Sequence, residues 1–222
     1  MDQKLFEKIK KAAEDSIKNP GKNEKPLPKA TLKPGENYIV VFRHGESEDN
    51  ARKIFSGWRD AKLTRKGIDQ AKVLAPKLRK LKLDLVITSD QTRSKETARY
   101  ALEYHPRIKW EKDWRIKERN YGDLSGTSKE EAMKANPEET IKWRRGYDDP
   151  PRRGESLKMV EERVFPFLDE LVNRIRNEKI NVVLSAHGNS MRAIRRYFEK
   201  MDIAEELTHE NPLGTDYALY PI

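Results

Sequence analysis

The segment YIVVFRHG at residues 38–45 decides the fold, because an apolar run of strand length passes directly into arginine, histidine and glycine. A continuous apolar run of this length is typical of a strand that is buried on both faces of a parallel sheet. In open α/β sheets, ligands bind beside the loops that follow the carboxyl ends of the strands. Arg43 and His44 are therefore candidate site residues.

A second segment of the same kind lies near the C-terminus, where the strand-like residues 181–185 lead into Ala186, His187 and Gly188. The chain has four histidines, so two of them stand between a strand and a glycine. Each could simply end its strand and make local hydrogen bonds. Two such pairs together with Arg43 instead favour one shared site, which forms if the two strands are neighbours in the sheet.

The remaining sequence alternates between strand patterns and helix patterns. Further strands are expected at residues 85–88, 107–110 and 217–220. Helices are expected at residues 2–18, 64–81, 92–104, 128–146 with a break at Pro137, 156–177 and 190–200. This alternation predicts an α/β fold with three layers, in which a mostly parallel central sheet is covered by helices on both faces.

Residues 1–36 are expected to form an N-terminal extension, and residues 37–222 the catalytic domain. A short amphipathic helix over residues 2–18 is followed by a stretch with four prolines, which cannot sustain a helix or a central strand. A mitochondrial transit peptide is an alternative, but the extension has six acidic residues and no arginine, contrary to that composition. We therefore expect a segment that packs on the core or tethers the protein.

Composition limits the class of protein further. The 222 residues carry a net charge of +9, which suits phosphates, nucleic acids or anionic membrane surfaces as ligands. The absence of cysteine excludes disulfides, thiolate nucleophiles and cysteine-liganded zinc, and it makes the cytoplasm the expected location. No apolar run approaches the roughly 20 residues of a membrane span, so no membrane association is expected.

Histidine and arginine at strand ends point to phosphate chemistry. With a pKa of roughly 6.5, an imidazole can be a neutral nucleophile or a cation that holds phosphate. Arginine supplies the planar charged donors that bind phosphate oxygens. Arg93 follows the strand at residues 85–88 and could serve here, although a solvated arginine at a helix start is equally compatible with its position.

Two other functional classes are less well supported. A nucleic-acid-binding module is suggested by the net charge and by Arg192, Arg195 and Arg196 on one helix, but zinc-ligand spacing and an aromatic binding platform are missing. A nucleotide-binding P-loop or dinucleotide fold is disfavoured, because the chain contains no Gly-x-Gly sequence.

An ordered series of motifs resembles the histidine phosphatase superfamily and, within it, the family of cofactor-dependent phosphoglycerate mutases. The series covers about residues 38–222 and consists of RHGES at 43–47 with Asn50, FSGWRD at 55–60, Thr88-Ser89 with Arg93, ERNYGDLSG at 118–126, WRR at 143–145, GESL at 154–157 and AHGNSMRA at 186–193. The resemblance implies the phosphoglycerate mutase-like version of the α/β fold.

The resemblance also implies a mechanism. His44 would take a phosphoryl group, Arg43, Arg93 and His187 would form the pocket around it, and Glu118 would be the acid/base that exchanges a proton with the substrate hydroxyl. Further matching positions are implied to bind the phosphate, the carboxylate and the second phosphate of the substrate: Ser47, Asn50, Ser56, Gly57, Tyr121, Lys129, Arg144, Arg145, Gly188 and Asn189. Without the resemblance, Glu118 would read as half of a surface ion pair, and the basic residues as a solvated helix face.

The implied activity is the interconversion of 3-phosphoglycerate and 2-phosphoglycerate in glycolysis and gluconeogenesis, primed by 2,3-bisphosphoglycerate and without a metal ion. The partners are small phosphorylated three-carbon acids, and monomer and homo-oligomer stay open. A phosphatase of the same superfamily is the alternative. Asp49 stands where the family usually has tryptophan, and Asn120 where histidine is usual. The chain ends at Ile222 without the tail that helps to close many mutases, so we expect more leakage of phosphate to water.

Overall fold

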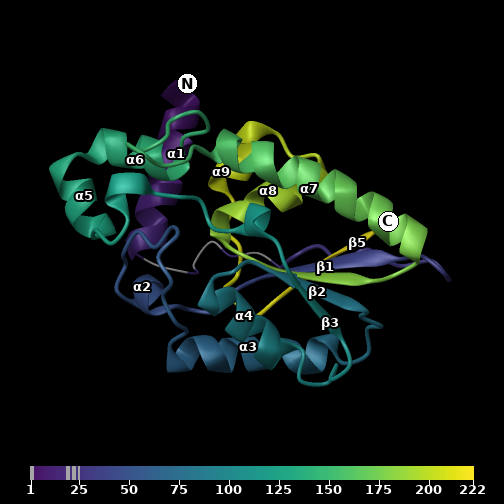
Figure 1. The fold of residues 1–222 in the computed structure, drawn as a ribbon. Helices are drawn as coiled ribbons and strands as arrows, with labels where there is room; N and C mark the ends of the chain where they lie inside the picture. The colour runs from purple at the N-terminus through teal and green to yellow at the C-terminus, as the bar shows by residue number, and fades with distance from the viewer. Residues whose placement is uncertain (1–2, 19–20, 22–23, 25) are drawn as a thin grey trace.

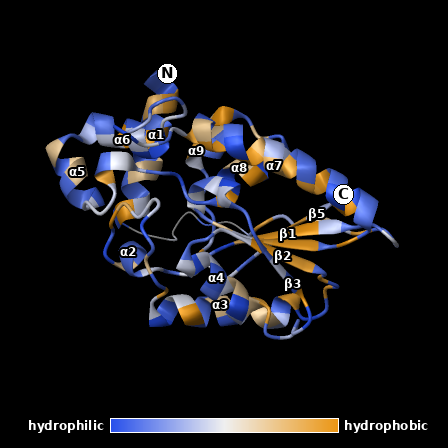
Figure 2. Ribbon diagram, viewed as in Figure 1, coloured by the Kyte–Doolittle hydropathy of each residue, from blue (hydrophilic) through white to orange (hydrophobic). Residues whose placement is uncertain are grey.

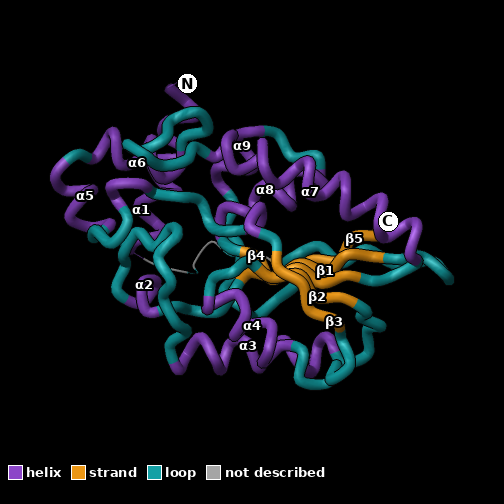
Figure 3. Tube along the Cα trace, in the orientation of Figure 1, coloured by secondary structure: helices purple, strands orange, loops and turns teal. Residues whose placement is uncertain are grey.

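A five-stranded sheet forms the centre of the protein (Figure 3). The computed structural model describes residues 3–18, 21, 24 and 26–222. The strands are β1 (Tyr38–Arg43), β2 (Leu85–Thr88), β3 (Lys109–Lys112), β4 (Val182–Ala186) and β5 (Ala218–Pro221), in the order β3-β2-β4-β1-β5. Only β5 runs antiparallel to its neighbour, so the mostly parallel sheet is confirmed.

Helices cover both faces of this sheet, which confirms the three-layer α/β fold (Figure 1). Along β1, Val40 and Phe42 pack with α3 (Arg65–Leu78) and α4 (Thr92–Ala101). The alternate residues Ile39 and Val41 pack with α7 (Leu157–Glu178) and α8 (Gly188–Glu199). Side chains alternate between the two faces of a strand, so a strand covered on both faces must be apolar throughout. Figure 2 shows this concentration of apolar residues in the strands.

Local signals fix most helix boundaries. The side chains of Thr64 and Ser156 accept hydrogen bonds from the first turns of α3 and α7, as expected of capping residues. The predicted break at Pro137 is confirmed, because it separates α5 (Lys129–Ala135) from α6 (Pro137–Arg145). Two short helices, α2 (Glu48–Ala51) and α9 (Ile203–Thr208), are not predicted by the sequence patterns.

The third strand begins two residues later than expected, at Lys109 rather than at residue 107. It lies at the edge of the sheet and most of its side chains are exposed. An edge strand of this kind lacks the apolar pattern that marks the buried strands, so the sequence places its ends poorly.

The N-terminal helix α1 (Gln3–Lys18) packs on the body of the protein beside α6 and α9 (Figure 1). Its buried residues Ile9 and Ala13 belong to the same apolar cluster as β1 and α7. Residues 26–37 then run along the sheet edge without a helix, where Ala30 and Leu219 are joined by a backbone hydrogen bond of 3.2 Å. Pro20, which was expected to lie in this linker, is outside the described residues.

The strand register brings three loops to one end of the sheet. Arg43 is paired with Ala186, so the residues that follow β1 and β4 are neighbours. Thr88 is paired with Ser185, which places the end of β2 beside them. In the described part of the chain, no helix is long and apolar enough to cross a membrane.

Candidate active site

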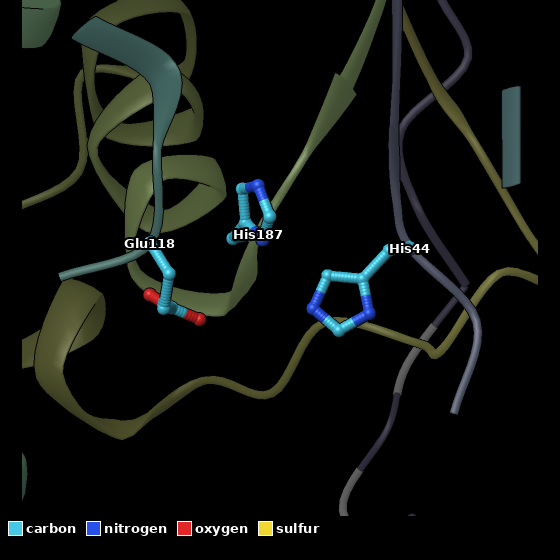
Figure 4. Close-up of side chains that lie close together, drawn as sticks. All are labelled: His44, Glu118 and His187. Carbon is cyan, nitrogen blue, oxygen red and sulfur yellow. The ribbon is translucent and has the colours of Figure 1, made fainter. Parts of the chain in front are cut away.

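His44 and His187 follow the paired strands β1 and β4, and their ring centroids are 5.0 Å apart (Figure 4). Both side chains are buried. The expectation that the two His-Gly loops meet at one edge of the sheet is thus confirmed by the geometry. Arg93, at the start of α4 beyond β2, is the third buried residue that reaches this point.

The hydrogen bonds of His44 determine its tautomer. Its Nδ1 lies 2.7 Å from the carbonyl oxygen of Gly45, which can only accept, so Nδ1 carries the proton. Nε2 keeps a lone pair and accepts from Nε of Arg93 at 3.2 Å. Burial and the charges of Arg93 and Arg43 hold the pKa of His44 well below its usual value. The ring is therefore neutral, with Nε2 as a candidate nucleophile.

His187 is neutral for similar reasons, since burial and the charge of Arg93 hold its pKa well below the usual value. Its Nε2 lies 2.7 Å from Oγ of Ser89. Its Nδ1 is buried and has no hydrogen-bond partner among the described residues. A polar atom in this condition is costly unless a ligand satisfies it, so His187 is suited to contact an oxygen of a bound group.

The two arginines differ in how firmly they are held. Nη1 and Nη2 of Arg93 donate to the carbonyl oxygens of Arg59 and Gly57 at 2.8 and 2.9 Å, which holds the guanidinium in place while its Nε donates to His44. Nη1 of Arg43 donates to the carbonyl oxygen of Asn211 at 2.9 Å, while its buried Nε has no partner among the described residues. Both guanidinium groups therefore present fixed positive charge beside Nε2 of His44.

Glu118 faces the two histidines from the loop before Tyr121 (Figure 4). Its Oε2 accepts from the backbone N–H of Gly188 at 3.0 Å, and its Oε1 accepts from the backbone N–H groups of Asn189 and Arg119 at 3.0 and 2.8 Å. Burial by itself raises the pKa of this carboxyl, but the Arg119 hydrogen bond and the arginine charges outweigh it and lower the pKa to about 2. Glu118 is thus ionised in this arrangement.

The three side chains in Figure 4 are also close enough to hold a cation, because the ligand atoms of His44, Glu118 and His187 all lie within 4.8 Å of one another. The charges around them argue against this. The charges of Arg43 and Arg93 both act on Glu118 and His44, so a metal ion bound to these side chains would be repelled by two guanidinium groups. This combination suits an anion such as a phosphoryl group better than a divalent cation.

A cavity of about 350 Å³ opens beside this cluster, near the lower end of the roughly 300–1,000 Å³ range of small-molecule sites. Most of the residues expected from the sequence line it, namely Arg43, Asn50, Ser56, Gly57, Glu118, Tyr121, Lys129, Arg144, Arg145, Gly188 and Asn189. Ser47 does not line it: this buried residue caps α2. His44, Arg93 and His187 are buried next to Glu118 rather than in the cavity wall.

Three basic residues that line the cavity, Lys129, Arg144 and Arg145, are here called its far wall. They differ in their hydrogen-bond partners and in their pKa. Arg145 is buried and paired with Glu210. Arg144 donates from both Nη atoms to α1, to the carbonyl oxygen of Ala13 at 2.7 Å and to Oγ of Ser16 at 2.8 Å. Burial and the charge of Arg144 lower the pKa of Lys129 to about 8.

Several buried residues that support the site were not singled out from the sequence. Gln91 joins two of its parts: Nε2 donates to the carbonyl oxygen of Gly57 at 2.9 Å, and Oε1 accepts from the backbone N–H of Glu118 at 3.1 Å. Arg163 of α7 donates to the carbonyl oxygen of Glu118 at 3.1 Å. Gln91 lies in the loop that follows β2, and Arg163 follows two acidic residues within a helix pattern, but neither position by itself indicated a contact with Glu118.

Asp49 is buried in place of the tryptophan expected from the resemblance. Its Oδ2 accepts from Oγ of Ser56 at 3.0 Å and from Nε of Arg59 at 3.2 Å. Since Arg59 also offers its carbonyl oxygen to Arg93, Asp49 stabilises the loop that holds this arginine. Asp49 therefore belongs to a local hydrogen-bond network beside the site.

Replacing Asp49 by alanine is expected to lower the free energy of unfolding by about 1–3 kcal/mol, because the buried Ser56 hydroxyl and Arg59 lose their acceptor. Urea unfolding followed by circular dichroism measures the change. The control is Asp69→Ala, which removes an exposed i,i+4 pair with Arg65 and is expected to cost less than about 0.5 kcal/mol. Equal losses for the two variants would contradict the role of Asp49.

Comparison with known proteins agrees with the geometry. Residues 39–215 match the family model of the histidine phosphatase superfamily (branch 1). A 2,3-bisphosphoglycerate-dependent phosphoglycerate mutase of Parvibaculum lavamentivorans is 40% identical over 171 residues, which are 74% of this chain and 81% of the relative. A protein of the same name from Bradyrhizobium is 39% identical over 172 residues, covering 75% of this chain and 83% of the relative.

Solved structures share the fold. That of a mycobacterial glucosyl-3-phosphoglycerate phosphatase complexed with VO3 has a TM-score of 0.74 and 26% identity, over 82% of this chain and 90% of that one. The match to the family model covers β1 from residue 39 and all of β2, β3 and β4 with the loops that follow them, whereas β5 lies beyond its end at residue 215. The chain belongs to the histidine phosphatase superfamily, branch 1.

Proposed function

We propose that this enzyme interconverts 3-phosphoglycerate and 2-phosphoglycerate through a phosphohistidine at His44, primed by 2,3-bisphosphoglycerate. The observation that carries the proposal is the neutral His44, whose Nε2 accepts from Arg93 and whose ring lies close to the Glu118 carboxylate, beside a cavity lined with cations. The relatives that are named for this activity support it. The reaction is an isomerisation used in glycolysis and gluconeogenesis.

Phosphoryl transfer follows from the position of His44. Nε2 attacks the phosphorus of the bound bisphosphate, the bond from phosphorus to the carbon-linked oxygen breaks, and the phosphoryl group becomes bonded to Nε2. Arg43 and Arg93 face the phosphoryl oxygens, where negative charge is spread in the transition state. His187, through its unpartnered Nδ1, can donate to one of these oxygens.

Glu118 handles the proton that the oxygen of the substrate gains or loses. In the arrangement described above it is ionised, because Arg93 and Arg43 lower its pKa. A phosphoryl group bound to both arginines neutralises their charge and so raises the pKa of Glu118 toward the range of a usable acid. Glu118 then protonates the departing oxygen, and as a carboxylate it takes the proton from the hydroxyl that receives the phosphoryl group in the reverse step.

The far wall of the cavity distinguishes a mutase from a simple phosphatase. An enzyme that returns the phosphoryl group to a different oxygen must hold the monophosphate while it reorients. Lys129 and Arg144 place positive charge where the carboxylate and the second phosphate of a three-carbon acid can bind. Small phosphorylated acids are therefore the substrates, and a metal ion has no part in the proposed steps.

The proposal is tested by incubating the purified protein with 3-phosphoglycerate, with and without a trace of 2,3-bisphosphoglycerate. An enolase-coupled absorbance assay follows 2-phosphoglycerate, and free phosphate is measured in parallel. We expect formation of 2-phosphoglycerate that the bisphosphate stimulates, with little release of phosphate. Phosphate release without isomerisation would overturn the proposal.

That contrary result would favour a second candidate, a phosphatase of the same superfamily. The observation behind it is the similarity to the solved glucosyl-3-phosphoglycerate phosphatase, whose TM-score is 0.74. In such an enzyme water instead of a substrate hydroxyl would take the phosphoryl group from His44. The cations of the far wall would then bind the rest of a different phosphomonoester.

The KM for 3-phosphoglycerate is expected to rise as the pH increases past about 8, where Lys129 loses its proton. Below its lowered pKa the ammonium group attracts the anionic substrate, and above it the amine is neutral. Lys129→Met is expected to have a higher KM at neutral pH and a smaller rise toward alkaline pH. The measurement is KM against pH in the coupled assay.

Two further variants make this pH test specific. Lys134→Met removes an exposed cation of the same helix and should keep the profile of the unmodified protein. Tyr121, with a pKa of about 8, becomes negative over the same range, so Tyr121→Phe separates its effect from that of Lys129. A profile that Lys129→Met leaves unchanged would show that this lysine does not bind the substrate.

A further inference from the structure

The N-terminal extension forms part of the wall of the catalytic cavity. Ser16, Ile17, Gly21 and Glu24 line the same cavity as Arg43 and Lys129. The helix that carries the first two is fixed, because Ile9 and Ala13 are buried in the main apolar cluster. The extension thus lines the cavity from outside the segment that matches the superfamily, which begins at residue 39.

One contact of this wall orients a cation. Oγ of Ser16 donates to the carbonyl oxygen of Ala13 at 3.0 Å and accepts from Nη2 of Arg144 at 2.8 Å. The same carbonyl oxygen accepts from Nη1 of Arg144 at 2.7 Å. The last turns of α1 therefore hold the guanidinium of Arg144 by both of its Nη atoms at the wall of the cavity.

A second residue of this wall, Glu24, places an acidic side chain in the same cavity as Arg43. Burial raises the pKa of Glu24, while the charge of Arg43 and a backbone hydrogen bond from Leu213 act in the opposite direction and favour its carboxylate form. Its backbone is fixed by a bridge to Glu210 and by a hydrogen bond of 3.2 Å to the carbonyl oxygen of Gly21. A bound phosphate would need the same charge of Arg43 and would be repelled by the Glu24 carboxylate.

We propose that Ser16, Ile17, Gly21 and Glu24 form a specificity wall, in which Ser16 orients Arg144 for the second anionic group of a ligand and Glu24 competes with the first for Arg43. Inorganic phosphate at Arg43 would be repelled by the Glu24 carboxylate and would make no contact with Arg144. A phosphorylated acid that spans the cavity gains the contact with Arg144 as compensation. The wall therefore selects ligands with two anionic groups. This inference rests on the function proposed above and adds the part of the chain that recognises the second anionic group.

Isothermal titration calorimetry with inorganic phosphate and with 3-phosphoglycerate tests the wall, because the two contacts predict opposite changes. Glu24→Gln keeps the shape of the side chain, removes its charge and is expected to tighten the binding of inorganic phosphate by about tenfold. Ser16→Ala is expected to weaken the binding of 3-phosphoglycerate by about fivefold and to leave that of inorganic phosphate unchanged.

Matched variants control for charge and for folding. Glu7→Gln makes the same change at an exposed position of α1 outside the cavity and should bind both ligands like the unmodified protein. Ser16→Thr retains the hydroxyl and should restore the affinity that Ser16→Ala loses. The melting temperature of every variant is measured to identify a general loss of structure. If Ser16→Ala unfolds, Glu24→Gln still tests the proposal through the affinity for inorganic phosphate.

The proposal is overturned if Glu24→Gln changes the affinity for inorganic phosphate no more than Glu7→Gln does. It is also overturned if Ser16→Ala lowers the affinities for inorganic phosphate and for 3-phosphoglycerate by the same factor. These outcomes are separate from the fate of the proposed mutase reaction, because binding is measured without turnover. A protein that releases phosphate instead of isomerising can still show the opposite responses of the two ligands. A protein that does not bind 3-phosphoglycerate still allows the Glu24 test with inorganic phosphate.

Discussion

His44→Ala is expected to lower the rate of phosphoryl transfer by at least about four orders of magnitude, since loss of a covalent nucleophile is among the most damaging changes in an enzyme. The variant lacks Nε2, the imidazole nitrogen of this residue that carries no proton and can attack phosphorus. The coupled assay measures the loss, and phosphorus NMR of the protein after incubation with 2,3-bisphosphoglycerate reports whether a phosphohistidine forms. We expect no such signal from the variant.

The matched control is His105→Ala, a histidine whose Nε2 contacts the carbonyl oxygen of Leu78 in the layer of α3 and α4. It should keep both the activity and the phosphohistidine signal when assayed below its melting temperature. A phosphohistidine signal that persists in His44→Ala would assign the nucleophile to another histidine. His187 would then be the first candidate, because its ring lies 5.0 Å from that of His44.

The position of His44 shows what the sequence can predict. The apolar strands at residues 38–42 and 181–185 could be recognised because burial on both faces demands apolar side chains throughout. The two His-Gly sequences at their ends could then be placed together, since neighbouring parallel strands end at the same edge. The pairing of Arg43 with Ala186 confirms this step. Arg93 follows from the same rule through β2.

What the sequence could not predict depends on contacts between distant segments. Glu118 stands in a loop without a secondary-structure signal, so only the resemblance pointed to it. No sequence pattern indicated a role for Gln91. Glu24 and Ser16 lie in the extension, for which the sequence predicts helix and linker but no docking position. A hydrogen bond such as that between Ser16 and Arg144 joins residues 128 positions apart, and no local pattern encodes such a pairing.

The far wall shows a second limit. Counting Lys129, Arg144 and Arg145 as three equivalent cations was reasonable from the sequence, but their surroundings differ. Arg145 is paired with Glu210 inside the protein, while Arg144 is shared with α1. Burial lowers the pKa of Lys129 to about 8, so its positive charge is lost as the pH rises past this value. Charge type can be read from a sequence, but the state of that charge depends on desolvation and partners in the folded protein.

Glu118→Gln is expected to lower kcat for 3-phosphoglycerate by about 10²–10⁴-fold, the usual contribution of a positioned acid or base. The amide has nearly the same shape but cannot hold or release the proton of the substrate oxygen. Its nitrogen also cannot accept a hydrogen bond, so one of the backbone donors at Gly188, Asn189 or Arg119 loses its partner. The exposed Glu48→Gln on α2 is the control and should keep full activity.

A second substrate separates proton transfer by Glu118 from its structural contacts. With 4-nitrophenyl phosphate the departing nitrophenolate is a stable anion and needs no proton, so an acid contributes little to its release. Glu118→Gln should therefore transfer this phosphoryl group to His44 with a much smaller loss than it shows with 3-phosphoglycerate. Equal losses for the two substrates would mean that Glu118 acts only by holding the loop and Gly188 in place. A loss confined to the substrate with the poor leaving group identifies the carboxylate as the proton donor, because both substrates place their phosphoryl group against the same arginines.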